Sequence, residues 1–198
     1  MSKETSLDSK NHILLSSFPR SGNTWLRLLL TDIFLQIENQ EVDHDALLSH
    51  IEKYVPDMHC DNLHNDCGSS STNFIIVKTH SKYDDIKIKH EKVIILYREP
   101  EDCLISFYYH QQAKGKVSVN SSISKEDFAN EKITQWIDFH SSYLHSAIPI
   151  STLSYENLHA NPLSSLKVLF KELGVYASEK ILLKAIESNK FRNFKGEW

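Results

Sequence analysis

The sequence is poor in the residues that make flexible connections. It has five glycines and five prolines among 198 residues, too few for a long glycine-rich or proline-rich linker. A chain of this length can bury one sizeable core and hardly two. We therefore expect a single domain over residues 1–198.

Cysteines and long apolar runs are scarce as well. Residues 1–10 are polar and mixed in charge, and the first apolar run, 13–18, is too short for a signal peptide. The apolar stretch 26–37 is interrupted by charged residues, which argues against a membrane span. Three cysteines without a secretion signal favour reduced thiols. We expect a soluble, cytoplasmic protein without a membrane partner.

Two of the cysteines lie close to two histidines in the run Met58–Cys67. The spacing Cys60-x3-His64-x2-Cys67 fits no common zinc motif. We predict no metal site there and interpret the run as a polar loop over a substrate pocket.

The sequence also lacks a basic run. Its net charge is −4, and the segment 38–66 alone holds eight carboxylates against one lysine, or −7, which leaves +3 for the remainder. Nucleic-acid binding depends on many phosphate contacts, so it is not expected. Any anionic ligand must be held by a few placed cations.

Short apolar runs alternate with longer amphipathic segments along the chain. Continuous apolar runs are typical of parallel strands that are covered on both faces. We predict strands over 13–18, 74–78, 93–98 and 148–155, and helices over 23–36, 100–110, 126–145, 162–173 and from Ser178 to 189. Core positions in the third helix are predicted to be Phe128, Ile133, Trp136, Ile137 and Leu144. This alternation predicts an α/β three-layer sandwich with a mainly parallel central sheet.

Ligands of such sheets bind at the carboxyl ends of the strands, here after Phe18, Val77 and Tyr97. The first of these places carries Ser17–Trp25, a tight turn that leads into a helix. Converging backbone N–H groups and Arg20 suit an oxyanion, although a plain helix cap would use the same residues. The Walker A pattern is absent, which argues against ATP.

The run Phe18–Trp25, FPRSGNTW, resembles the 5′-phosphosulfate loop Y-P-K-S-G-T-T-W of the sulfotransferases that depend on 3′-phosphoadenosine-5′-phosphosulfate (PAPS). The run Tyr97–His110 resembles their 3′-phosphate segment, R-N-P-x-D-x-x-x-S-x-Y, with Arg98 and Ser106 at the family's spacing. Between the two, Lys78-Thr-His80 resembles a K-T-H sequence that ends a strand in the cytosolic branch.

Two weaker matches follow downstream. Ser154–Pro162 resembles Y-E-D-x-x-x-x-P, and Phe191–Trp198 is a shortened form of R-K-G-x-x-G-D-W. Together the matches imply the P-loop-like sulfotransferase fold, with PAPS as donor, 3′-phosphoadenosine 5′-phosphate (PAP) as product, a small-molecule acceptor and no metal.

The resemblance also implies roles for individual residues. Arg20 stands where the family has Lys, as it does in related bacterial sulfotransferases, and would reach the bridging oxygen of the leaving phosphate. The implied nucleotide-binding residues are Arg20, Ser21, Gly22, Asn23 and Thr24 for the 5′-phosphate, Trp25 and Tyr155 for adenine, and Arg98, Ser106, Arg192, Lys195 and Gly196 for the 3′-phosphate. Core packing is the alternative for Trp25 and Tyr155, and an ion pair with Glu99 or Glu101 is the alternative for Arg98.

The implied catalytic residues are His80, Lys78 and Arg20. A neutral imidazole at position 80 suits a general base that deprotonates an acceptor hydroxyl, with an expected pKa near 6–7. Lys78 would neutralise charge on the sulfuryl oxygens, unless it is a solvated lysine at a strand end.

The acceptor is less defined than the donor. Because the acidic segment falls within 38–72, where the family covers its acceptor, we expect a polar or cationic metabolite such as a natural-product alkaloid, modified on a hydroxyl or an amine. Tyr108, Tyr109 and His110 either line that pocket or pack in the core. The oligomeric state is not indicated. Two other functions remain open: a P-loop-like nucleotide kinase, and an inactive nucleotide-binding interaction protein.

Overall fold

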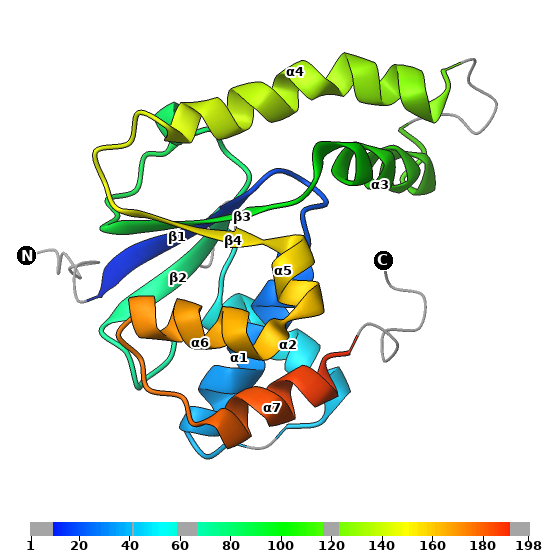
Figure 1. Cartoon of the computed structure of the whole chain (residues 1–198). Coiled ribbons are helices and arrows are strands. Elements are labelled where there is room, and N and C mark those ends of the chain that lie inside the picture. Colours follow the sequence, from blue (N-terminus) through cyan, green and yellow to red (C-terminus); the bar gives the residue numbers. More distant parts are fainter. Residues whose placement is uncertain (1–9, 41, 59–66, 117–122, 191–198) are drawn as a thin grey trace, which may run out of the picture.

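The structure is a computed structural model that describes residues 10–40, 42–58, 67–116 and 123–190. Its strands and helices alternate through most of these ranges (Figure 1). In chain order they are β1 (Asn11–Ser17), α1 (Asn23–Ile37), α2 (His44–Tyr54), β2 (Phe74–Thr79), η1 (Tyr83–Asp85), β3 (Lys92–Tyr97), α3 (Pro100–Ala113), α4 (Lys125–Tyr143), β4 (Ile150–Ser154), α5 (Tyr155–Ala160), α6 (Pro162–Glu172) and α7 (Glu179–Ser188).

The described strands form one parallel sheet in the order β2-β1-β3-β4. Leu15 pairs with Lys78 on one side and with Ile94 on the other. The apolar runs of β1, β2 and β3 are buried, as expected for strands covered on both faces. Pro149 precedes β4, which lies at a sheet edge, where a missing N–H costs least.

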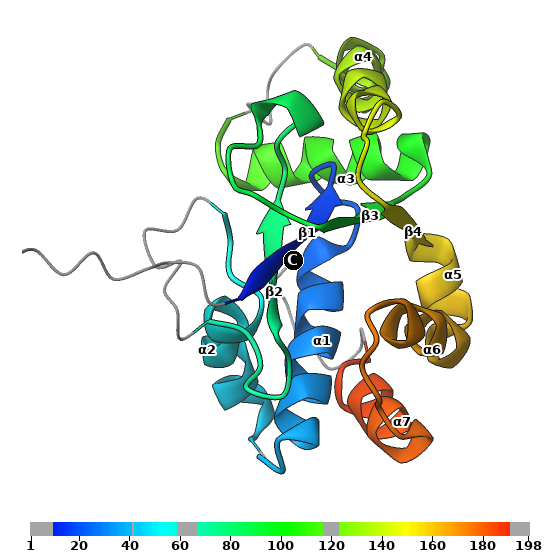
Figure 2. The same cartoon turned by 90° about the vertical axis from the view of Figure 1, so that its left-hand side faces the viewer.

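Helices cover both faces of this sheet. Helices α3 and α4 lie on one face, and α1, α2, α6 and α7 lie on the other (Figures 1 and 2). Each face of the sheet has its own hydrophobic core, and successive residues of β1 point to opposite cores. Leu14 packs in the core on the α3–α4 side and Leu15 in the core on the α1 side. The predicted three-layer sandwich is confirmed.

Helix α4 corrects part of the core prediction. Phe128 is buried as predicted, but Ile137 is 49% exposed and Leu144 is 80% exposed. The buried positions of its second half are Phe139 and Tyr143 instead. Helix α4 lies outermost over α3, so only one stripe of its surface can be covered.

Several described residues of the acidic segment help to hold the fold together. Its helix α2 packs on α1 through the buried Leu47 and Ile51. Glu52 pairs with Arg27 of α1 at 2.6 Å, while Glu38 accepts hydrogen bonds from Tyr54 and Ser69. None of the helices in the described ranges is both long and apolar enough to cross a membrane.

Candidate active site

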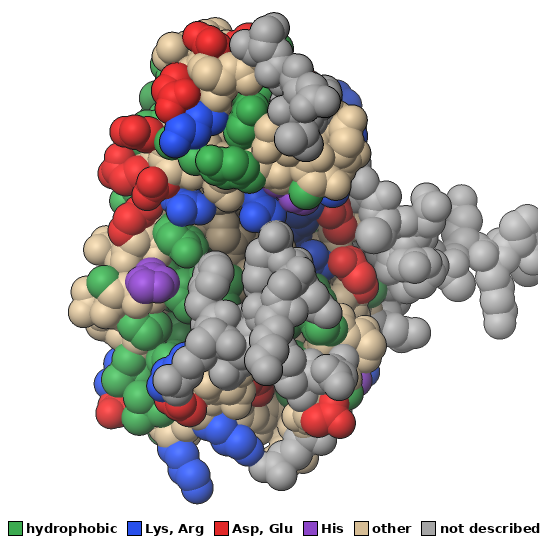
Figure 3. Space-filling view, turned by 90° about the vertical axis from the view of Figure 1, so that its right-hand side faces the viewer, with side chains coloured by type: hydrophobic (Ala, Val, Ile, Leu, Met, Phe, Trp, Pro, Cys, Tyr) green, Lys and Arg blue, Asp and Glu red, His purple; other side chains and the backbone are tan. Residues whose placement is uncertain are grey.

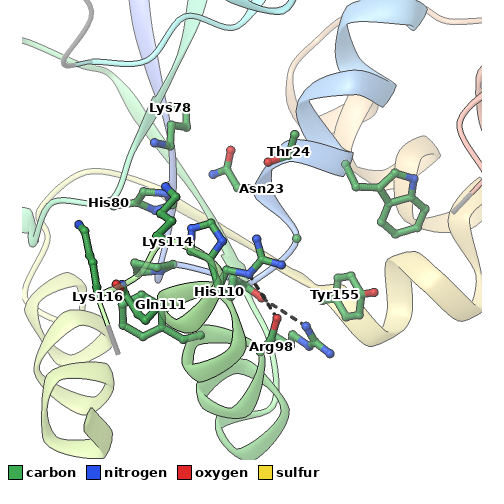
Figure 4. A pocket seen from close by; sticks show the side chains of 16 residues that line it. Asn23, Thr24, Lys78, His80, Arg98, His110, Gln111, Lys114, Lys116 and Tyr155 are labelled. Carbon is green, nitrogen blue, oxygen red and sulfur yellow. Dashed lines mark hydrogen bonds between the residues drawn. The ribbon is translucent and has the colours of Figure 1, made fainter. Parts of the chain in front are cut away.

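A cavity of about 580 Å³ opens at the carboxyl ends of β1, β2 and β3 (Figure 4). Most residues that the sequence singled out line it. The lining consists of Pro19, Arg20, Gly22, Asn23, Thr24, Trp25, Lys78, His80, Arg98, Ser106, Phe107, His110, Gln111, Lys114, Lys116 and Tyr155. No carboxylate belongs to this lining within the described residues.

The loop from β1 to α1 makes a tight turn at the cavity wall. Arg20 has a φ of 72° and Gly22 a φ of 94°, both in the left-handed region. A Cβ on Gly22 would lie 2.5 Å from the Tyr155 ring, so only glycine fits between the loop and α5. The first intrahelical bond of α1 runs from Leu26 N–H to Gly22 C=O, so the N–H groups of Asn23 and Thr24 precede it and can meet an anion.

Two guanidinium groups meet at the wall of this cavity. Arg20 Nε donates to Ser106 Oγ at 3.2 Å, and Arg98 donates to the carbonyl of Arg20 at 3.3 Å. Burial and the neighbouring Arg98 lower the pKa of Arg20. Among the described residues Arg98 Nε is buried without a partner, and Arg98 forms no ion pair with Glu99 or Glu101. Such a pair of cations attracts a multiply charged anion.

Tyr155 and Trp25 close the cavity on the α5 side. The Arg98 guanidinium lies 4.6 Å from the centre of the Tyr155 ring, a cation–π contact. Trp25 meets Tyr155 edge to face at 6.0 Å and donates from Nε1 to the Asn189 carbonyl at 2.8 Å. Trp25 is 6% exposed, so it belongs both to the core and to the cavity wall.

His80 follows β2 and is held by β1. Its Nδ1 lies 2.6 Å from the Ser17 carbonyl oxygen, which can only accept, so Nδ1 carries the proton and Nε2 carries the lone pair. Burial and the nearby Lys78 lower the pKa of His80 to about 4. The expected pKa near 6–7 is therefore wrong for the ligand-free protein, because desolvation penalises the imidazolium.

Lys78 is not a freely solvated lysine. Its Nζ lies 2.5 Å from Asp57 Oδ2, and both side chains are mostly buried. A backbone bridge between Asp57 and Lys78 holds this pair at the end of β2. Asp57 was not singled out in the sequence, because nothing in its surroundings marks it as the partner of a lysine 21 residues away.

Some of the predicted residues do not line the cavity, and others lie outside the described residues. Ser21 is fully buried, and its Oγ lies 3.6 Å from Cys103 Sγ. Arg192, Lys195 and Gly196 lie outside the described residues, as does most of the Met58–Cys67 run with Cys60 and His64. No described residue of 38–72 lines the cavity.

The structure brings residues from the end of α3 and just beyond it to the cavity, and of these only His110 was a candidate from the sequence. His110, Gln111, Lys114 and Lys116 line the cavity, whereas Tyr108 is buried and Tyr109 is 54% exposed. His110 was expected either to line the pocket or to pack in the core, and one further helical step of four residues would also have found Lys114.

Comparison with known proteins places the chain among sulfotransferases. It is 27% identical over 176 residues to cytosolic sulfotransferase 7 of Arabidopsis thaliana, covering 79% of this chain and 54% of that protein. It is 23% identical over 187 residues to a flavonol sulfotransferase-like protein of Flaveria bidentis, covering 88% and 60%. The chain thus spans little more than half the length of these curated relatives.

Among solved structures, mouse sulfotransferase SULT7A1 complexed with PAP has a similar fold. The TM-score is 0.63 at 19% identity, over 98% of this chain and 71% of the mouse protein. The sulfotransferase domain family matches residues 10–198, which is nearly the whole sequence. The chain therefore belongs to the sulfotransferase domain family.

Proposed function

We propose that this chain transfers the sulfuryl group of PAPS to a hydroxyl or an amine of a small molecule and releases PAP. One observation carries the proposal. Arg20 of the β1–α1 loop and Ser106 of α3 lie 86 residues apart in sequence, yet they meet at 3.2 Å beside the unpartnered Nε of Arg98. A nucleotide with phosphates at both its 5′ and 3′ positions suits these two adjoining sites.

The nucleotide would lie across the cavity from the loop to α5. The N–H groups of the α1 start, with Arg20, Asn23 and Thr24, would bind the 5′-phosphosulfate. Arg98 and Ser106 would bind the 3′-phosphate, and adenine would lie near Trp25 and Tyr155. Ser21 remains a proposed member of this site by position in the loop, since its side chain is buried and its N–H donates to the Phe18 carbonyl at 3.3 Å. Arg192, Lys195 and Gly196 remain proposed members of the 3′-phosphate site.

The chemical step requires one base and neutralisation of charge. The acceptor oxygen or nitrogen forms a bond to sulfur while the bond from sulfur to the bridging phosphate oxygen breaks, and the acceptor proton passes to His80 Nε2. Arg20 would stabilise the leaving phosphate, and Lys78, oriented by Asp57, would face the sulfuryl oxygens. Exclusion of water by the bound substrates would strengthen both contacts.

The acceptor and the surroundings of the reaction are part of the proposal too. Segment 38–72 would cover the acceptor. The names of relatives such as cytosolic sulfotransferase 7 favour a cytoplasmic location. The expectation of a polar or cationic acceptor rests on the acidic residues of this segment. Several of them are engaged in the fold, and no described residue of 38–72 reaches the cavity, so the described residues do not support a cationic acceptor.

A nucleotide titration tests this function. PAP should raise the melting temperature far more than adenosine 5′-phosphate does, because only PAP carries the 3′-phosphate, and tight binding stabilises by mass action. In Arg98→Ala, PAP affinity should fall by roughly 2–4 kcal/mol and the advantage over adenosine 5′-phosphate should shrink. Equal shifts with the two nucleotides would refute the assignment, and a larger shift with ATP would favour a nucleotide kinase.

A further inference from the structure

Helix α3 carries a row of polar and basic side chains into the cavity. Ser106 and His110 lie on α3, Lys114 directly follows its last residue, and the four-residue spacing of the three places them along one side of the helix. Ser106 already bonds Arg20. The face therefore runs from the proposed nucleotide site toward the carboxyl end of α3, about 12 Å away at the helical rise per residue.

The far end of this row lies on the His80 side of the cavity. In Figure 4, Lys114 and Lys116 lie toward His80, and Tyr155 lies on the opposite side. A nucleotide held between the β1–α1 loop and Tyr155 would leave these lysines beside the position of the acceptor. Figure 3 shows Lys and Arg side chains gathered across the middle of the face turned to the viewer.

The charge at this end is not balanced by the described residues. Lys114 and Lys116 form no ion pair within the described part of the chain, and no carboxylate lines the cavity there. Burial lowers the pKa of His110, and the nearby Arg20, Lys114 and Lys116 lower it further. A cationic acceptor would be repelled from this end of the cavity.

We propose that the acceptor carries an anionic group, such as a carboxylate or a phosphate, which binds Lys114 and Lys116 while its hydroxyl or amine faces His80. This inference rests on the proposed function, because it needs the nucleotide to occupy the opposite end of the cavity. It replaces the cationic acceptor that the acidic segment suggested.

Three phenols of similar size and different charge test the proposal. With PAP saturating, calorimetry would measure the binding of 4-hydroxyphenylacetate (anionic), tyrosol (neutral) and tyramine (cationic). We expect the anionic probe to bind at least about fivefold tighter than the other two, since exposed charge pairs contribute up to about 1 kcal/mol each. Its affinity should also fall as salt is added.

Paired variants locate the source of this preference. In Lys114→Gln/Lys116→Gln the anionic advantage should disappear while the Kd of PAP stays within about twofold. The control Lys171→Gln/Lys180→Gln removes two exposed charges from α6 and α7, outside the cavity, and should keep the preference. Equal binding of the three probes, no binding of the anionic probe, or a variant that weakens PAP instead would each overturn the proposal.

The outcome is separable from that of the proposed function. If PAP fails to bind the unaltered protein, sulfuryl transfer is refuted. The comparison between the unaltered protein and Lys114→Gln/Lys116→Gln, repeated without nucleotide, still decides whether these lysines hold an anion.

Discussion

At the scale of single residues, the chemistry depends on the state of His80. The hydrogen bond from Nδ1 to the Ser17 carbonyl fixes the tautomer, and burial keeps the ring neutral at pH 7. A neutral imidazole with a free Nε2 can accept a proton. His80→Asn should retain a donor to Ser17 and keep PAP binding, yet lower turnover by on the order of 10²–10⁴-fold. Transfer from radiolabelled PAPS would measure the loss.

The pH profile provides a second readout for the same residue. Because only the neutral base is active, kcat/KM falls as pH drops through the pKa of free His80, about 4 rather than 6.5. Lys78→Ala serves as the control, since it removes a cation that lowers this pKa and should move the acid limb upward. An acid limb near 6.5 in the unaltered enzyme, unmoved by Lys78→Ala, would contradict a buried His80 base.

The motifs predicted that Lys78 and His80 belong to the site, but not which groups surround these two side chains. The spacing of Lys78 and His80 at a strand end indicated which side chains meet the cavity. It carried no information on Asp57 or the Ser17 carbonyl, because both are long-range contacts. The shifted pKa of His80 depends on these contacts and on burial, so it could not be inferred from the pattern.

At the scale of elements, the packing of the β1–α1 loop against α5 depends on Gly22. Gly22→Ala would strain the left-handed φ and push a methyl group into the Tyr155 ring. We expect a loss of roughly 2–4 kcal/mol in unfolding free energy, measured by urea denaturation. Gly174→Ala, with a φ of 68° and open space around it, should cost only about 1 kcal/mol.

A double variant separates the two causes at Gly22. In Gly22→Ala/Tyr155→Ala the steric clash is gone and the strain of φ remains. Relative to Tyr155→Ala, the added methyl group should therefore lower the unfolding free energy by about as much as Gly174→Ala does. If Gly22→Ala alone costs no more than Gly174→Ala, the loop is not packed against α5 as described.

Elements with strong local signals were predicted, and those without were missed. Pro100 and Pro162 begin their helices and Gly174 follows α6, as the sequence indicated. Helix α2 was not predicted. Leu47 and Ile51 lie in the acidic segment, which was interpreted as a whole as a cover over the acceptor. Helix α5 begins at Tyr155, directly after β4, where Ser154 both ends the strand and caps the helix.

At the scale of the whole molecule, the cavity lies at the carboxyl ends of the strands, where the two cores meet. Trp25 belongs to the core on the α1 side, while Phe18 and Cys103 belong to the core on the α3 side. Arg20 and Ser106 come together only because β1 and β3 are neighbours in the sheet. Alternating strands and helices predicted the layers, but strand order is a long-range property that the pattern leaves open.

The same arrangement makes the ligand-free protein sensitive to acid. His80, His110 and His140 all have pKa values lowered chiefly by burial, so the folded state binds fewer protons than the unfolded chain. Stability is fully present above the unfolded pKa of about 6.5 and is lost as pH falls toward the folded pKa, about 4 for His80. The lowered pKa values of Glu38, Glu52 and Glu156 act in a lower window, as these carboxylates protonate below about 4.5.

Between pH 7 and pH 5 the histidines therefore dominate the change in stability. Acidification over this range should lower the unfolding free energy by about 2 kcal/mol through His80 alone, because the imidazole is protonated in the unfolded chain and stays neutral in the folded protein. Urea denaturation at both pH values would measure the loss without nucleotide. In His80→Asn that share should vanish, so the variant should lose about 2 kcal/mol less than the unaltered protein does. Equal losses in the two proteins would mean that His80 titrates normally in the folded state, and its proposed role as a base buried beside Lys78 would then have to be abandoned.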